Sequence, residues 1–206
     1  MADKKQLEAF TSPIGEAIYP WISKADTKHD AAGVFHTDLS VPFEAADAFI
    51  AKLEKVRNDF KATLPVNKQG ALTDKPVYEQ EYSRPVYKEG MTPEEKAAAK
   101  AAHVPELTGN VLFRFKLKNN VTTGAGETFT QTPIVVNAAD GEKVEGPVYM
   151  GSIIRVRGQI VPYTNSMSGV VGVTLRMKAV QVIEQVGGSG SGSSFWTDGF
   201  NDEEAA

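Results

Sequence analysis

The stretch Val111-Leu-Phe-Arg-Phe-Lys-Leu-Lys118 (VLFRFKLK) alternates apolar and basic residues one by one over its second half. Successive side chains of a β-strand point to opposite faces, so this period predicts a strand with one face in a core and the other in solvent. Two later stretches, Ser152–Tyr163 and Val170–Val186, are also predicted as strands. The C-terminal half is therefore predicted to be a β structure with cations on exposed strand faces.

Upstream of this stretch, two strands and one helix are predicted. Ile14–Ser23 is a short strand with breakers, whereas Val34–Val41 alternates clearly and ends at Pro42. Apolar residues at spacings of three and four then predict a helix from Glu44 to about Leu64. Those residues are Phe49, Leu53, Val56 and Phe60.

Residues 65–109 are predicted to be an irregular insertion because prolines interrupt them repeatedly. One short helix is expected inside, since Thr92 can cap it, Pro93 suits its first position, and KAAAKAA follows. Beyond the insertion, Phe129–Asn137 is predicted as a further strand. Several strands with helical decoration favour an all-β protein, and an OB-fold over residues 1–186, a five-stranded Greek-key barrel, fits best.

The last twenty residues differ from the rest in composition. Residues 187–194 (GGSGSGSS) are typical of a flexible linker, and residues 195–206 (FWTDGFNDEEAA) are predicted to be a disordered acidic tail. Aromatic residues among acids suit a docking peptide better than a solubility tail. At roughly 25 Å, linker and tail together could reach a basic groove on the same chain. The predicted partner-binding residues are Phe195, Trp196, Asp198, Phe200, Asp202, Glu203 and Glu204.

Charge and composition narrow the functional class. The chain has 22 basic and 26 acidic residues, a formal net charge of −4. The acidic excess lies in the tail, and residues 111–187 have eight basic and five acidic residues. The absence of cysteine excludes a disulfide framework and a thiolate metal site, and it suits a reducing compartment. No secretory signal or membrane-spanning run is present, so a cytoplasmic location is predicted.

The alternation predicts that basic side chains share strand faces. If the three late strands are neighbours, their cations would form a groove that follows a phosphate backbone. Solubility and edge protection are the alternative explanation for such cations. Tyr163 lies in a polar context (VPYTNS) and is predicted to stack on a base. The predicted DNA-binding cations are Arg114, Lys116, Lys118, Arg155, Arg157, Arg176 and Lys178.

Signals for catalysis or for a cofactor are weak. No phosphate-binding loop, dinucleotide motif or nucleophile elbow occurs. His36 and Asp38 would share a strand face, but a third ligand at a suitable spacing is missing, so a surface pair is favoured over a metal site. We therefore predict no enzyme activity, no metal and no cofactor.

Three segments together resemble one family, the replication single-stranded DNA-binding proteins of T-seven-type podophages. They are FTSPIGEAIYPWISKAD…GVFHTDLSVP at residues 10–42, FRFK at 113–116, and IVVNAADGEKVEGPVYMGSIIRVRGQIVPYTN at 134–165. The resemblance extends over nearly the whole chain. Ala32 and Asn165 stand where the family has a basic and an aromatic residue, and this tail ends in Ala-Ala rather than Phe.

The resemblance implies an OB-fold dimer that binds single-stranded DNA without sequence preference and promotes strand annealing in the cytoplasm of the host. It implies that the acidic tail contacts the phage DNA polymerase and helicase-primase. It assigns DNA contacts to Arg114, Lys116 and Tyr163, and it matches the family's basic N-terminus to Lys4 and Lys5. A protein-interaction or assembly module on the same fold, without DNA affinity, is the alternative prediction.

Overall fold

The computed structural model describes residues 7–88 and 90–186. Within them, five strands close into a barrel: each pairs with the next in the order β2, β3, β6, β11, β10, and β10 pairs again with β2. The pair β6–β11 is parallel and the other pairs are antiparallel. A closed Greek-key barrel of this kind is an OB-fold, which confirms the predicted fold class. The strands are β2 (Gly15–Asp26), β3 (Val34–Pro42), β6 (Leu107–Lys118), β10 (Ile153–Asn165) and β11 (Val170–Glu184).

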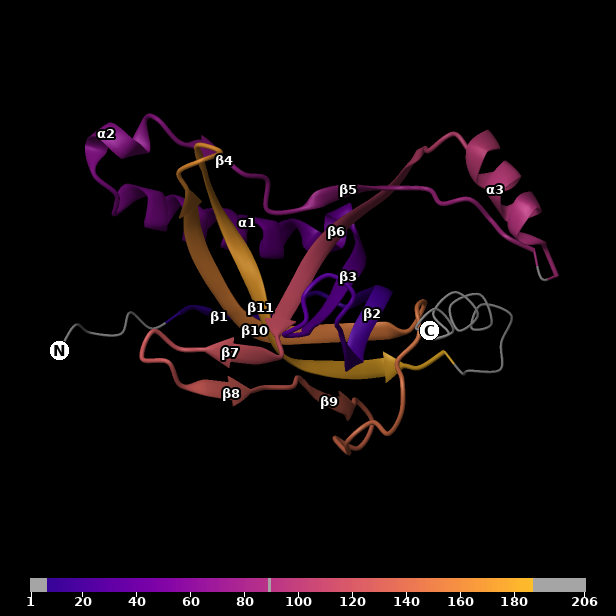
Figure 1. The fold of residues 1–206 in the computed structure, drawn as a ribbon. Coiled ribbons are helices and arrows are strands. Elements are labelled where there is room, and N and C mark those ends of the chain that lie inside the picture. The colour runs from indigo at the N-terminus through magenta and orange to yellow at the C-terminus, as the bar shows by residue number, and fades with distance from the viewer. Residues whose placement is uncertain (1–6, 89, 187–206) are drawn as a thin grey trace.

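The barrel interior is filled by the apolar half of each alternating strand. Phe113 and Phe115 of β6 are fully buried, as the period of VLFRFKLK predicts. Helix α1 (Phe43–Ala62) contacts β3, β6, β10 and β11 and closes one end of the barrel (Figure 1). Phe49 of α1 meets Phe113 edge to face at 5.0 Å between ring centroids, so the helix contributes to the same core as the strands.

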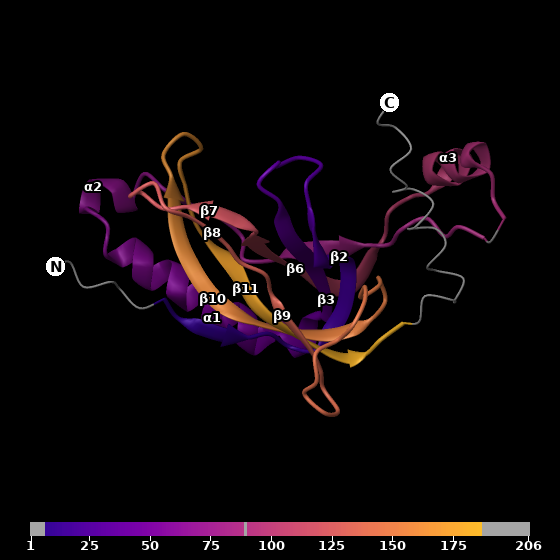
Figure 2. The same cartoon turned by 60° about the horizontal axis from the view of Figure 1, so that its bottom comes forward.

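Strands β10 and β11 are long and curve around the barrel (Figure 2). Their register shifts between Arg157 and Gly158, where β11 has one extra residue, Lys178. A Cβ at Gly158 would lie 2.0 Å from the carbonyl oxygen of Arg176, so only glycine fits this close approach. The irregularity is a β-bulge, a device that increases local bending and twist.

The irregular insertion contains α2 (Val66–Gln69), β4 (Thr73–Asp74), β5 (Glu79–Tyr82) and α3 (Pro93–Ala102). Strands β4 and β5 pair with the barrel strands β11 and β6, whereas the α3 end extends away from the barrel as an arm (Figure 1). Thr92 caps α3 in a capping box with Glu95, as predicted, and none of residues 93–102 is buried. At the base of the arm the buried carboxylate of Glu81 accepts hydrogen bonds from Ser40 Oγ (2.7 Å) and Asn110 Nδ2 (3.2 Å), which joins β5 to β3 and β6.

Two predicted strands differ from the structure. The segment predicted as one strand, Phe129–Asn137, is two: β8 (Thr128–Thr130) pairs with β7 (Asn120–Thr122), whereas β9 (Ile134–Asn137) pairs with β11. Pro133 precedes β9 and cannot donate to a ladder, which separates the two. Strand β2 continues to Asp26, beyond its predicted end, and its register against β3 shifts between Ile18 and Trp21 and again between Trp21 and Asp26. A further short strand, β1 (Ala9–Thr11), pairs with β10.

The N-terminal residues 1–6 and the predicted linker and tail, 187–206, lie outside the described residues. Among the residues that are described, no helix is long and apolar enough to cross a membrane.

Candidate nucleic-acid interface

The outer face of β3 and β6 presents polar and charged side chains in direct register. His36 lies opposite Lys116, and Asp38 lies opposite Arg114. Lys118 follows opposite Val34. The predicted shared face of Arg114, Lys116 and Lys118 is therefore present, and all three residues are exposed. In OB-folds the face of the second and third barrel strands, here β3 and β6, is where oligonucleotides bind.

Strand β11 extends this face with further cations. Arg176 pairs directly with Lys116 across the parallel β6–β11 contact, and Gln159 of β10 lies on the other side of Arg176. Lys118 and Lys178 each follow two residues further along their strands, and Arg157 of β10 lies opposite the bulge. We call these five residues the cationic row: Lys116, Lys118, Arg157, Arg176 and Lys178.

Most of the cationic row has no neutralising neighbour. Within residues 7–88 and 90–186, the side chains of Lys116, Lys118, Arg157 and Arg176 have no hydrogen-bond or ion-pair partner. Lys178 Nζ lies 3.4 Å from Gln131 Oε1, a long contact to a neutral group. Like charges that are held side by side without counter-charges attract anions, so this row is suited to a phosphate backbone.

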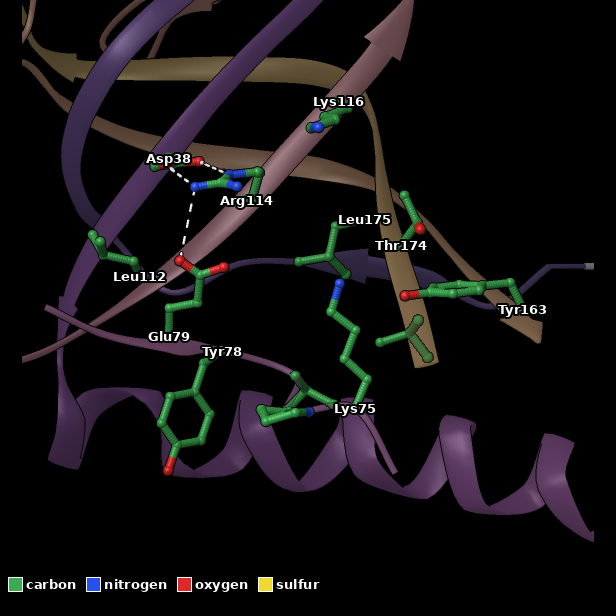
Figure 3. Close-up of a pocket in the computed structure, with 13 residues that line it drawn as sticks. Asp38, Lys75, Tyr78, Glu79, Leu112, Arg114, Lys116, Tyr163, Thr174 and Leu175 are labelled. Atoms are coloured by element: carbon green, nitrogen blue, oxygen red, sulfur yellow. Dashed lines mark hydrogen bonds and ion pairs between the residues drawn. The ribbon is translucent and has the colours of Figure 1, made fainter. Parts of the chain in front are cut away.

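Arg114 differs from the cationic row because it is already paired. Its Nε and Nη2 donate to the two carboxylate oxygens of Asp38 at 2.9 and 3.1 Å, and Glu79 Oε2 lies 3.8 Å away (Figure 3). The hydrogen bond with Asp38 raises the pKa of Arg114 above its ordinary value. The guanidinium is thus permanently charged but occupied by two acidic residues.

Arg155 lies two residues before Arg157 on the same face of β10. It lies opposite Gln181, where β11 pairs with β9 instead of β6. Four residues of extended strand, about 13 Å, separate it from Gln159, which neighbours Arg176. Its Nε is buried without a hydrogen-bond partner among the described residues. Arg155 therefore lies further from Arg176 than Arg157 does, and its contact with DNA stays a prediction.

Tyr163 lies at one end of a pocket between β6, β11 and the segment before β5. Its ring covers Gly172: a Cβ there would lie 2.9 Å from the Tyr163 hydroxyl and 3.0 Å from Cζ. Lys75 and Thr174 also line this pocket, which we call the Tyr163 pocket (Figure 3). An aromatic ring beside a lysine at the end of a cationic face suits a stacked base with its phosphate.

A second pocket lies at the other end of the face, and the sequence did not predict it. Trp21, His36 and Lys28 line it, and the Trp21 and His36 rings are 6.4 Å apart between centroids. Trp21 reaches this position because the β2 bulge sets it opposite His36; Tyr19 in that bulge has a φ of 50°. We call this the Trp21 pocket. Asp38, Arg114 and Lys116 line both pockets, so the two are continuous across β3 and β6.

His36 contacts Asp26 through its Nε2, at 3.3 Å from Oδ2. Burial raises the pKa of Asp26, but the backbone N–H of Lys28 and the His36 ring outweigh it and lower that pKa overall. No group of three or more His, Asp or Glu side chains suited to a metal ion occurs in the described part of the chain. Asp26 and His36 form a polar pair at the floor of the Trp21 pocket.

Some predicted residues fall outside the described ranges. Lys4 and Lys5 precede residue 7. The predicted tail residues follow residue 186: Phe195, Trp196, Asp198, Phe200, Asp202, Glu203 and Glu204.

The barrel order, with its parallel closing pair, defines an OB-fold protein. Its structure is similar to the crystal structure of gp2.5, a single-stranded DNA-binding protein encoded by bacteriophage T7, with a TM-score of 0.63 at 22% sequence identity, over 98% of this chain and 99% of that chain. It also aligns with the single-stranded DNA-binding protein from bacteriophage Enc34 in complex with ssDNA, at a TM-score of 0.48, 15% identity and 88% and 89% coverage. No protein-family model matches the sequence, and no curated protein sequence does. The first likeness supports the fold.

Proposed function

We propose that this chain binds single-stranded DNA without sequence preference, in phage DNA replication, recombination and strand annealing, and that it does so without catalysing a reaction. One observation carries the proposal: the OB-fold face has a row of cations, most of them without a partner among the described residues, beside two pockets that each contain an aromatic ring and share Lys116. Cations neutralise phosphates of any sequence, and every base has a face that can stack on an aromatic ring.

In this proposal the phosphates contact Lys116, Arg176 and the rest of the cationic row, with Arg114 in support. One base stacks on Tyr163 and another on Trp21. Arg155, two residues before Arg157 on the same face of β10, adds positive charge beside the row. Lys4 and Lys5 add N-terminal charge.

The acidic tail supplies a second interaction in this proposal. Its aromatic and acidic residues would recruit the phage DNA polymerase and helicase-primase, and in the free protein the tail would compete with DNA for the cationic row. The protein would act as a homodimer in the host cytoplasm. Deleting residues 195–206 should then tighten DNA binding and weaken polymerase contact; unchanged DNA affinity would contradict the competition.

The test is a fluorescence titration with oligo-dT and with a matched duplex across a salt series. A Trp196→Phe variant leaves Trp21 as the sole tryptophan, so that quenching reports on the Trp21 pocket itself. We expect tight, salt-sensitive binding to the single strand, weak binding to duplex, and a log–log salt slope of about −3 to −4 for four to six phosphate contacts. Absence of binding to either DNA would favour a protein-interaction module instead.

A further inference from the structure

The two pockets share three residues, and two of these form an ion pair. Asp38 and Arg114 come from the two central strands of the face, β3 and β6, and Lys116 is the third. A strand of DNA that extends from the Trp21 pocket to the Tyr163 pocket would therefore pass beside this pair and Lys116. The cations on its β11 side, in contrast, have no acidic partner among the described residues.

The geometry of the pair imitates a phosphate contact. Arg114 donates through Nε and Nη2 to two oxygens of one carboxylate, at 2.9 and 3.1 Å. Guanidinium groups bind two oxygens of a phosphate through the same parallel hydrogen bonds. Asp38 thus occupies the donors that a phosphate would need. Glu79, 3.8 Å from Nη2, approaches from the arm side.

The exposure of the two residues differs, and this decides which one can move. The Asp38 side chain is 14% exposed, whereas the Arg114 side chain is 52% exposed. The carboxylate is thus held against the sheet while the guanidinium can turn toward solvent. Because more than half of the Arg114 side chain is exposed, an incoming phosphate can reach its donors and replace the carboxylate.

We propose that Asp38 is an internal competitor of DNA, which holds Arg114 until a backbone phosphate displaces its carboxylate. This inference rests on the proposed function and adds a regulation of the same site. In free protein the pair is closed. In the complex Arg114 binds a phosphate between the two stacked bases, and Asp38 is released. Asp38 therefore lowers the affinity for DNA and makes binding depend on contacts in both pockets.

The experiment is a double-mutant cycle in the full chain, with Asp38→Asn, Arg114→Gln and the double variant, titrated with oligo-dT at fixed salt. Asp38→Asn should tighten binding by about two- to fivefold, the range expected for release from an exposed ion pair. In the Arg114→Gln background the same substitution should have almost no effect, because the guanidinium that it releases is missing.

Asp26→Asn is the matched control. It removes an acid from the Trp21 pocket that contacts His36 rather than Arg114. Any gain in affinity from it should be equal in the unaltered chain and in the Arg114→Gln background. Thermal melts of each variant verify that the barrel is intact.

Three outcomes separate the possibilities. A gain from Asp38→Asn that disappears in the Arg114→Gln background supports the competitor role. An equal gain in both backgrounds, or none, overturns it while the unaltered protein still binds DNA. Failure of the unaltered protein to bind oligo-dT at low salt overturns the proposed function, and the competitor role with it.

Discussion

Replacing Lys116 and Arg176 together tests whether the cationic row meets phosphates. The two residues are directly paired across β6 and β11 and have no partner in residues 7–88 and 90–186, so their neutralisation by DNA releases nothing but counterions. Each phosphate engaged on a single strand contributes about 0.7 to the log–log salt slope. We therefore expect the variant Lys116→Gln/Arg176→Gln to have a slope smaller in magnitude by about 1.4.

The same slope gives the loss of affinity. A phosphate contact that contributes about 0.7 to the slope raises the binding constant roughly fivefold at 0.1 M salt relative to 1 M salt, so two contacts raise it roughly 25-fold. The difference between the variant and the unaltered protein should therefore disappear as salt approaches 1 M. Titration with oligo-dT at five or more salt concentrations, followed by tryptophan fluorescence, measures both quantities.

A control variant is available on the helix that closes the barrel. Lys55 on α1 is exposed and pairs with Asp59, so Lys55→Gln removes a cation that does not belong to the face. Its slope should equal that of the unaltered protein. Equal slopes for the unaltered protein and for the Lys116→Gln/Arg176→Gln variant would refute the assignment of phosphates to this row.

Three further predictions concern stacking, packing and pH. Trp21→Ala and Tyr163→Ala should each weaken binding by about 1–3 kcal/mol at every salt concentration without changing the slope, and a changed slope in the same titration would argue against stacking. Gly158→Ala should lower the free energy of unfolding by about 3 kcal/mol or more in urea denaturation, because its Cβ would lie 2.0 Å from a carbonyl oxygen. Gly124 has open space around it, so Gly124→Ala should change the free energy of unfolding little. The hydrogen bond from Lys61 lowers the pKa of Asp74, so this pair stabilises the folded state at pH values above the ordinary aspartate pKa. That stabilisation is lost as pH falls through the lowered pKa of the folded state. Asp74→Asn should reduce the acid-induced fall in unfolding free energy by less than about 1 kcal/mol, and an unchanged fall would show that the pair contributes nothing.

The features that the sequence predicted well depend on local geometry alone. The alternation of VLFRFKLK follows from the two-residue period of a strand, and the structure has Phe113 and Phe115 inside and the basic residues outside. The helix after Pro42 and the capping box at Thr92 likewise depend on residues a few positions apart. These relations hold in any fold, so no knowledge of the tertiary structure was needed.

The features that the sequence could not predict depend on contacts between distant segments. Trp21 joins the face because a bulge in β2 changes its register against β3. Arg114 appears in the sequence as one more exposed cation, and only the pairing of β3 with β6 brings Asp38 against it. Arg155 and Arg157 have the same local pattern and both lie opposite residues of β11 that pair with β9, whereas Arg176 lies where β11 pairs with β6. Register across a barrel, rather than the identity of residues, decides which cations act together.

The arm offers a practical and an evolutionary consequence. Because no side chain of α3 is buried, its sequence and length are almost unconstrained by the barrel, which meets the base of the arm where Glu81 accepts a hydrogen bond from Ser40. Exposed segments of this kind tolerate insertions and substitutions far better than packed ones. A reporter domain or an affinity handle inserted at α3 should leave the barrel folded. Sequence divergence among distant homologues should concentrate in the same segment, so that the arm could gain binding to new partner proteins while the barrel stays unchanged.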